Sequence, residues 1–170
     1  MKDSRHFYFT WIARGYQEAC LYLGDALNGS CRAVIRETTE QFFNLGAFGL
    51  LDGYGSYLFS NFITSDRAYA FWQSERNGFA HLYRYRLTEN ESICEGDLFD
   101  ASEKELIIQK LIRVDEREKQ IYFMANNVPE CSDPMYYQLY RIGFDGSGLT
   151  RLTPEDAVHQ ISMGSQSFVD

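Results

Sequence analysis

The sequence predicts an all-β fold, a partial β-propeller of about three blades of antiparallel β-meander. Three observations support this: an aromatic-rich composition, a strand order that occurs three times, and turn residues where the strands should reverse. Of the 170 residues, 16% are aromatic, with 12 Tyr and 13 Phe against 3 Pro. Such a composition suits half-buried strands better than helices. The length fits one unit, residues 1–170, with a sizeable core.

A Leu-Tyr pair recurs at nearly equal spacing along the chain. It occurs in Cys20–Tyr22, His81–Tyr83 and Gln138–Tyr140, with the tyrosines 61 and 57 residues apart. Self-similarity at a fixed period is the signature of a repeat architecture, in which each repeat is one supersecondary unit. The pair therefore marks the same strand in three units, and the approximate blades are 1–45, 46–100 and 101–170.

The strands around each Leu-Tyr pair follow one order. An aromatic strand comes first, in Phe7–Trp11, Tyr69–Gln73 and Ile121–Ala125. A turn and a short strand come afterwards, in Cys31–Ile35, Ile93–Cys94 and Leu149–Thr153. A unit of roughly 50 to 60 residues with three or four meandering strands has the size of a propeller blade. A β-sandwich is the competing all-β fold, but it gives no reason for the same order to occur three times.

Turn chemistry and alternation support these boundaries. Asn28-Gly29, Asn77-Gly78 and Asp145-Gly146 supply residues that tolerate the positive φ of tight hairpins. Leu82–Leu87 changes side at every residue, as a strand with unequal faces does. Ser102–Ile112 begins with a Ser-x-x-Glu of the helix-capping kind, but its Leu-Ile-Ile run reads equally as strand, and we predict a strand.

Charge and hydropathy exclude some function classes. A net charge of -8 argues against nucleic acid as a partner, because binding phosphates requires clustered Lys and Arg. No apolar run reaches the roughly 18 residues of a membrane span, so no membrane span is expected. Residues 1–25 lack a signal-peptide pattern. The chain opens almost directly into a strand, which indicates a piece of a longer protein.

The cysteines predict neither a metal site nor a defined disulfide. Cys20, Cys31, Cys94 and Cys131 have no CxxC spacing and no nearby histidine pair, which argues against structural zinc. Cys20 and Cys31 flank a turn, and their spacing permits a disulfide without requiring one. We expect no cofactor and no metal.

Residues Ser74–Tyr83, Ser-Glu-Arg-Asn-Gly-Phe-Ala-His-Leu-Tyr, closely resemble a strand-turn-strand segment of the propeller in the dipeptidyl peptidase IV family, within the prolyl oligopeptidase clan. Trp11–Val34 with Glu37–Asn44 is similar to the preceding blade. Leu139–Arg141 with Asp145–Glu155 is similar to the following blade. Residues 46–68 depart from the family pattern by what looks like a Gly- and aromatic-rich insertion.

The resemblance implies a parent that is a serine exopeptidase, in which an N-terminal propeller caps an α/β-hydrolase domain. The partners it implies are that hydrolase domain in the same parent chain and short peptides. The fragment would be non-catalytic, with a scaffolding and gating role. Only the resemblance bears on the compartment, and it points to the periplasm or another extracytoplasmic location. The alternative is a non-catalytic propeller binding module, TolB-like or other, because similar blade signatures occur there.

The sequence contains no complete catalytic machinery. The clan requires a Gly-x-Ser-x-Gly elbow, which is absent; the glycine-serine pairs at Gly55-Ser56 and Gly164-Ser165 read as connections. The histidines lack a partner motif for general-base work. We therefore predict no catalytic residue and read the matched segment as a structural blade signature, whose members are Ser74, Glu75, Arg76, Gly78, His81, Leu82 and Tyr83.

Two further expectations concern surfaces. Phe42 and Phe43 fall where the family has an aromatic loop that can face the substrate cavity, although an ordinary contact between blades is the simpler interpretation. Three blades outside a closed ring would leave open edges and an uncovered apolar face. The fragment is therefore expected to self-associate, for example as a dimer.

Overall fold

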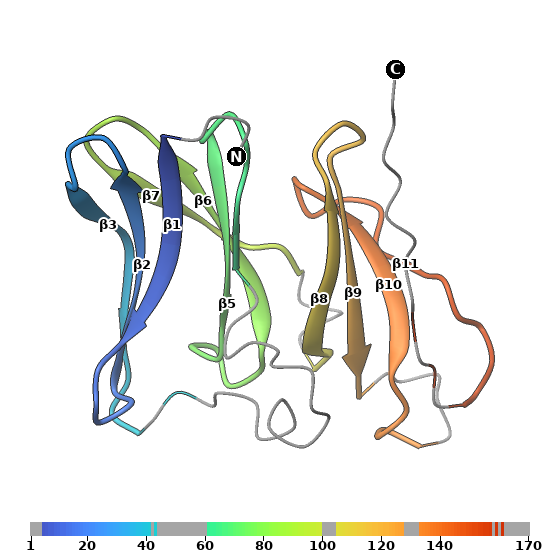
Figure 1. The fold of residues 1–170 in the computed structure, drawn as a ribbon. Helices are drawn as coiled ribbons and strands as arrows, with labels where there is room; N and C mark the ends of the chain where they lie inside the picture. The colour runs from blue at the N-terminus through green and yellow to red at the C-terminus, as the bar shows by residue number, and fades with distance from the viewer. Residues whose placement is uncertain are drawn as a thin grey trace. The chain divides into compact units, whose positions relative to one another are not determined.

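The computed structural model describes residues 5–41, 43, 61–99, 105–127, 133–157, 159 and 161, which form three antiparallel sheets and no helix (Figure 1). The first sheet has the order β1 (His6–Ile12), β2 (Glu18–Asp25), β3 (Cys31–Thr38). No helix within these ranges has the length and apolar character needed to cross a membrane. The predicted all-β fold is confirmed.

The second and third sheets are four-stranded meanders. The second has the order β4 (Asn61–Ile63), β5 (Tyr69–Ser74), β6 (His81–Leu87), β7 (Ser92–Asp97). The third runs from β8 (Ile107–Asp115) through β9 (Gln120–Asn126) and β10 (Gln138–Gly143) to β11 (Thr150–Arg151). β8 confirms a strand within the predicted segment 102–112 from Ile107 onward, while residues 102–104 lie outside the described residues. β4 lies in the segment interpreted as an insertion, so part of that segment belongs to the repeated meander.

The Leu-Tyr repeat corresponds to one register in all three sheets. Each tyrosine pairs with an aromatic residue of the preceding strand: Phe9 with Tyr22, Trp72 with Tyr83, and Phe123 with Tyr140. The repeated sequence order therefore encodes a repeated three-dimensional unit, as a partial propeller requires.

Each sheet contains an irregularity in a strand at its edge. β3 carries one extra residue, Val34, opposite the step between Leu21 and Tyr22 of β2. β7 carries Glu95 opposite the step between Arg84 and Tyr85, followed by Gly96 at φ +124°. Two register shifts interrupt the pairing of β8 with β9. A bulge bends the strand that carries it and increases its local twist.

The chain divides into two compact units, residues 1–98 and 99–170. Unit 1 contains the first two sheets, whose facing side chains share a core of buried residues: Ala19, Leu21, Val34, Ile35, Phe43, Ile63, Ala70, Trp72, Tyr83, Tyr85 and Leu87. Unit 2 contains the third sheet, in which Phe123 packs against Phe99 and Tyr140. The blade limits given above stay a prediction.

The strand register keeps two cysteines apart. Cys20 of β2 lies opposite Arg36, whereas Cys31 of β3 lies opposite Gly24. Cys20, Cys31 and Cys94 are free thiols, and Cys131 is outside the described residues. Burial, and then the charge of Glu18, raises the pKa of the Cys20 thiol.

Candidate functional site

A polar cluster joins the two sheets of unit 1; it is called the Glu37 cluster and consists of Glu37, Trp72, Ser74, Arg76 and Tyr85. Glu37 Oε2 accepts hydrogen bonds from Trp72 Nε1 at 2.7 Å and from Arg76 Nη2 at 2.5 Å. Its Oε1 accepts one from the Ser74 hydroxyl at 2.5 Å. Arg76 also donates to Tyr85 Oη at 3.0 Å and to Ser74 Oγ at 2.9 Å. One carboxylate of the first sheet thus binds three side chains of the second.

Local structure explains how the second sheet presents these groups. Trp72 and Ser74 are two residues apart on β5, so strand alternation places both side chains on one face. Arg76 follows in the turn to β6, where Gly78 N donates to Glu75 O at 2.8 Å. Arg76 N also donates to Ser74 Oγ at 3.1 Å. The hairpin therefore aims the guanidinium back toward β3.

The charges of the cluster compensate one another. Burial opposes the charge on Arg76, but the hydrogen bond to Tyr85 and the charge of Glu37 outweigh it, so the pKa of the guanidinium is raised. The guanidinium also lies 4.2 Å from the centre of the Tyr83 ring, a cation-π distance. Burial, and then the negative charge of Asp97, raises the pKa of Tyr83. Burial also raises the pKa of Tyr85, so both tyrosines keep their hydroxyl protons.

The hydrogen bonds of the cluster leave it little capacity for catalysis. The one hydroxyl hydrogen of Ser74 points to Glu37, and Ser74 is only 3% exposed. A nucleophile must be reachable by substrate and activated by a base that accepts its proton. In this structure Ser74 is closed to solvent and joins β5 to Glu37 of β3.

The residue types of a catalytic triad are close together in the matched segment, but they are not arranged as one. Ser74 and His81 are cross-strand partners, and His81 Nδ1 lies 2.6 Å from Asp97 Oδ2. The Ser74 proton is directed to Glu37 rather than to the imidazole, and the His81 side chain is 3% exposed. His81 and Asp97 instead link β6 to β7.

The remaining predicted site residues have the following places. Leu82 is fully buried on β6, and Glu75 lies exposed in the β5–β6 turn, which Gly78 closes at φ +93°. Phe43 is 8% exposed, belongs to the core of unit 1, and its N–H donates to Tyr16 O at 2.7 Å. Phe42 lies outside the described residues. The substrate-lining role of the two phenylalanines stays a prediction.

Three members of the cluster, Glu37, Trp72 and Tyr85, were not identified from sequence as partners of the signature, and Glu37 is the most distant of them in the chain. Its contacts with Trp72, Ser74 and Arg76 span 35 to 39 residues. No local pattern encodes a contact of that range, and only the alternation of β3 and β5 could have suggested it. Within the described ranges, no group of three or more His, Cys, Asp or Glu has the geometry to hold a metal ion.

Three antiparallel meanders that share one strand order and one register define the class of this chain: it is a partial β-propeller. The chain belongs to the family described as the dipeptidyl peptidase IV N-terminal region, whose family model matches residues 1–170. A search of curated proteins finds no match.

Two solved structures share the fold. Dipeptidyl peptidase 4 from Porphyromonas gingivalis is similar with a TM-score of 0.64 at 14% identity, over 90% of this chain and 18% of that one. A putative TolB from Agrobacterium tumefaciens is similar with a TM-score of 0.56 at 12% identity, over 89% of this chain and 46% of that one. The chain thus spans less than half the length of either structure.

Proposed function

We propose that this chain is a non-catalytic scaffold in a serine-type dipeptidyl peptidase, where it caps an α/β-hydrolase domain and limits access to short peptides. The observation that carries the proposal is the family match over all 170 residues. The chain corresponds to 18% of the P. gingivalis enzyme, so most of such a protein, including its hydrolase domain, would lie outside this sequence.

The polar chemistry of unit 1 supports a scaffolding role. Each member of the Glu37 cluster is engaged by another member, and His81 and Asp97 link two strands. Buried polar groups whose hydrogen bonds are all satisfied make the surrounding structure rigid. A propeller built from such sheets would restrict access by its rigid shape.

The test compares this chain with the longer protein that contains it. A Xaa-Pro chromogenic dipeptide measures hydrolysis, and a fluorophosphonate probe labels an activated serine independently of substrate preference. We expect hydrolysis and labelling in the longer protein and neither in the 170-residue chain. Labelling of this chain would contradict its non-catalytic role.

The gating part of the proposal has its own measurement. The longer protein should release a dipeptide from a short Xaa-Pro peptide but not from the same sequence placed at the amino terminus of a folded protein. Equal rates on both substrates would contradict gating while leaving the peptidase assignment intact.

The second candidate is a non-catalytic binding module, favoured by the likeness to the putative TolB at a TM-score of 0.56. The hydrolysis and labelling test distinguishes the binding module from the peptidase scaffold. If the longer protein neither hydrolyses the dipeptide nor takes up the probe, the binding module becomes the better assignment.

A further inference from the structure

Cys94 of β7 is an exposed free thiol beside the Glu37 cluster. It pairs with Tyr85 of β6, and Tyr83 lies two residues before Tyr85 on that strand, so the thiol shares one face of the second sheet with both tyrosines. Arg76 Nη1 lies 4.0 Å from Cys94 Sγ, with the sulfur as acceptor. The thiol therefore meets solvent on one side and the guanidinium of the cluster on the other.

The bulge in β7 directs the next carboxylate in the sequence away from this thiol. Glu95 is the extra residue of the bulge, and its carboxylate binds Arg84 and Arg86. These arginines alternate with the two tyrosines along β6, so Glu95 lies on the opposite face of the sheet. Asp97 shares the face of the thiol, but its carboxylate is held by His81 at 2.6 Å. The charged group that contacts the sulfur is thus a cation.

Two polar groups near the thiol lack a strong hydrogen-bond partner. Among the described residues, the sulfur is the one acceptor for Arg76 Nη1, whereas Nη2 donates to oxygens of Glu37 and Tyr85. Tyr83 is 4% exposed, and no described residue forms a hydrogen bond with its hydroxyl. Sulfur is a weak acceptor, and a buried hydroxyl without a partner is destabilising. Both groups would gain from an additional oxygen atom.

The Tyr83 hydroxyl and the Cys94 thiol belong to one site. Burial raises the pKa of this hydroxyl, and the charge of Cys94 is among those that raise it further. The Arg76 guanidinium connects the two groups, because its carbon lies 4.2 Å from the centre of the Tyr83 ring while Nη1 faces the sulfur. An oxygen atom bonded to the sulfur would therefore meet two donors that lack an oxygen acceptor in the unmodified chain.

We propose that Cys94 is an oxidation site, at which hydrogen peroxide converts the thiol to a sulfenic acid that Arg76 and Tyr83 bind. The thiolate, formed by loss of the thiol proton, attacks one peroxide oxygen, so that a sulfur–oxygen bond forms as the oxygen–oxygen bond breaks. Sulfur loses two electrons, and the departing hydroxide takes up a proton, which gives sulfenic acid and water. The sulfenic oxygen accepts hydrogen bonds from Arg76 Nη1 and Tyr83 Oη.

Dimedone, which traps sulfenic acids, tests the proposal when it is added to the reduced protein together with hydrogen peroxide. Mass spectrometry of the cysteine peptides then measures the labelling of each thiol. Cys31 is the internal control, an exposed free thiol on the edge strand β3, and no described residue forms a hydrogen bond with its sulfur. We expect Cys94 to be labelled at least about fivefold faster than Cys31, because two donors surround its sulfur. Equal labelling of the two thiols would overturn the proposal.

Tyr83→Phe separates binding of the sulfenic oxygen from simple exposure of the thiol. It removes a hydroxyl that no described residue uses, so the fold should be retained, and it should slow the labelling of Cys94 about threefold. The matched control is Tyr140→Phe, the equivalent register position of the third sheet, 5% exposed compared with 4% for Tyr83. This control should leave the rate unchanged. Equal rates in the two variants would contradict the proposal, and the comparison of Cys94 with Cys31 needs no variant at all.

Discussion

Three side chains of the second sheet bind one carboxylate of the first sheet. The Glu37 side chain is 11% exposed and that of Arg76 is 31% exposed, so the pair is shielded from water without being sealed from it. Removing one partner of a buried pair leaves the other charge uncompensated, which costs more than the intact pair contributes. Partial exposure reduces that cost through solvent screening.

Glu37→Gln tests this cost, since glutamine keeps the shape and removes the charge. It should reduce the free energy of unfolding by about 1–3 kcal/mol, and lower the melting temperature by roughly 3–10 °C for a chain of this size. Thermal denaturation followed by circular dichroism provides the measurement. Glu40→Gln, an exposed change three residues away, is the control; equal melting of the two variants would contradict the role of Glu37.

The Arg5–Asp25 pair is expected to make the stability of the fold depend on pH. The hydrogen bonds from Arg5, at 2.6 and 2.9 Å, and from the N–H of Leu27 lower the pKa of this carboxyl to about 2 from an ordinary 3.8. Because the folded pKa is depressed, the stabilisation is present above about pH 4 and is lost as the pH falls toward 2.

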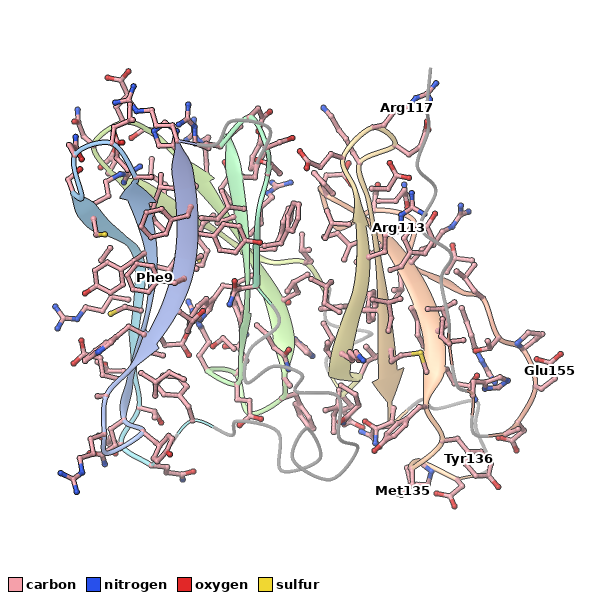
Figure 2. All side chains as sticks on the ribbon, in the orientation of Figure 1. Phe9, Arg113, Arg117, Met135, Tyr136 and Glu155 are labelled. Atoms are coloured by element: carbon pink, nitrogen blue, oxygen red, sulfur yellow. The ribbon has the colours of Figure 1, made fainter. Side chains whose placement is uncertain are left out.

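Carboxyl chemical shifts followed by NMR from pH 5 to pH 1.5 would check the value. In Arg5→Gln the Asp25 pKa should rise toward 3.8, whereas Arg117→Gln, at the β8–β9 turn labelled in Figure 2, should not move it. An Asp25 that titrates near 4 in the unchanged protein would refute the prediction.

The signature residues could be found from sequence, but their long-range partners could not. Ser74, Arg76 and His81 are recognisable because they belong to one short motif around a turn. Whether Glu37 contacts the signature residues depends on which face of β3 packs against which face of β5. That choice is made by the apolar core of unit 1, where Leu21 and Ile35 pack with Trp72, and no local pattern specifies it.

At the scale of one element, the bulge in the edge strand β7 requires a backbone conformation that favours glycine. Gly96 has φ +124°, which side chains rarely adopt, and it follows the extra residue Glu95. The Glu95 carboxylate lies 2.8 Å from Arg84 Nε and 3.1 Å from Arg86 Nε. The bulge therefore turns Glu95 toward two arginines of the neighbouring strand.

Gly96→Ala should destabilise the chain by about 1–2 kcal/mol, because alanine resists this backbone conformation although the surrounding space is open. Urea denaturation measures the loss. The control is Gly15→Ala, in a turn with ordinary φ and with its nearest neighbouring atom at 3.9 Å. A control that loses as much as Gly96→Ala would show that backbone strain is not the cause.

Elements with strong local patterns were predictable from sequence. The aromatic strands, the Leu-Tyr strands, and the Asn-Gly and Asp-Gly turns that follow one or the other correspond to the observed hairpins. β4 was missed because its three residues, Asn61–Ile63, are too few to show alternation. Its pairing with β5 is set by the β5–β6 hairpin beside it.

At the scale of the whole molecule, the two units should respond separately to a change in one of them. The three side chains that donate hydrogen bonds to Glu37 lie in unit 1, and so do both tryptophans. Hydrogen exchange on Glu37→Gln should show faster exchange in β3 and β5, with β8, β9 and β10 unchanged. Equal acceleration in the third sheet would show that the units unfold together.

The bulges of β3, β7 and β8 have a consequence for solubility. Every extra residue, Val34, Glu95, Gln109 and Ile112, lies in a strand at the edge of its sheet. A flat edge is a template on which further strands can add without limit, and a bulge disrupts that template. β1, by contrast, pairs with β2 in unbroken register from His6 to Ile12. Within the first sheet, strand addition would therefore be opposed at β3 more than at β1, and a proline in β1 would remove a backbone donor that such addition uses.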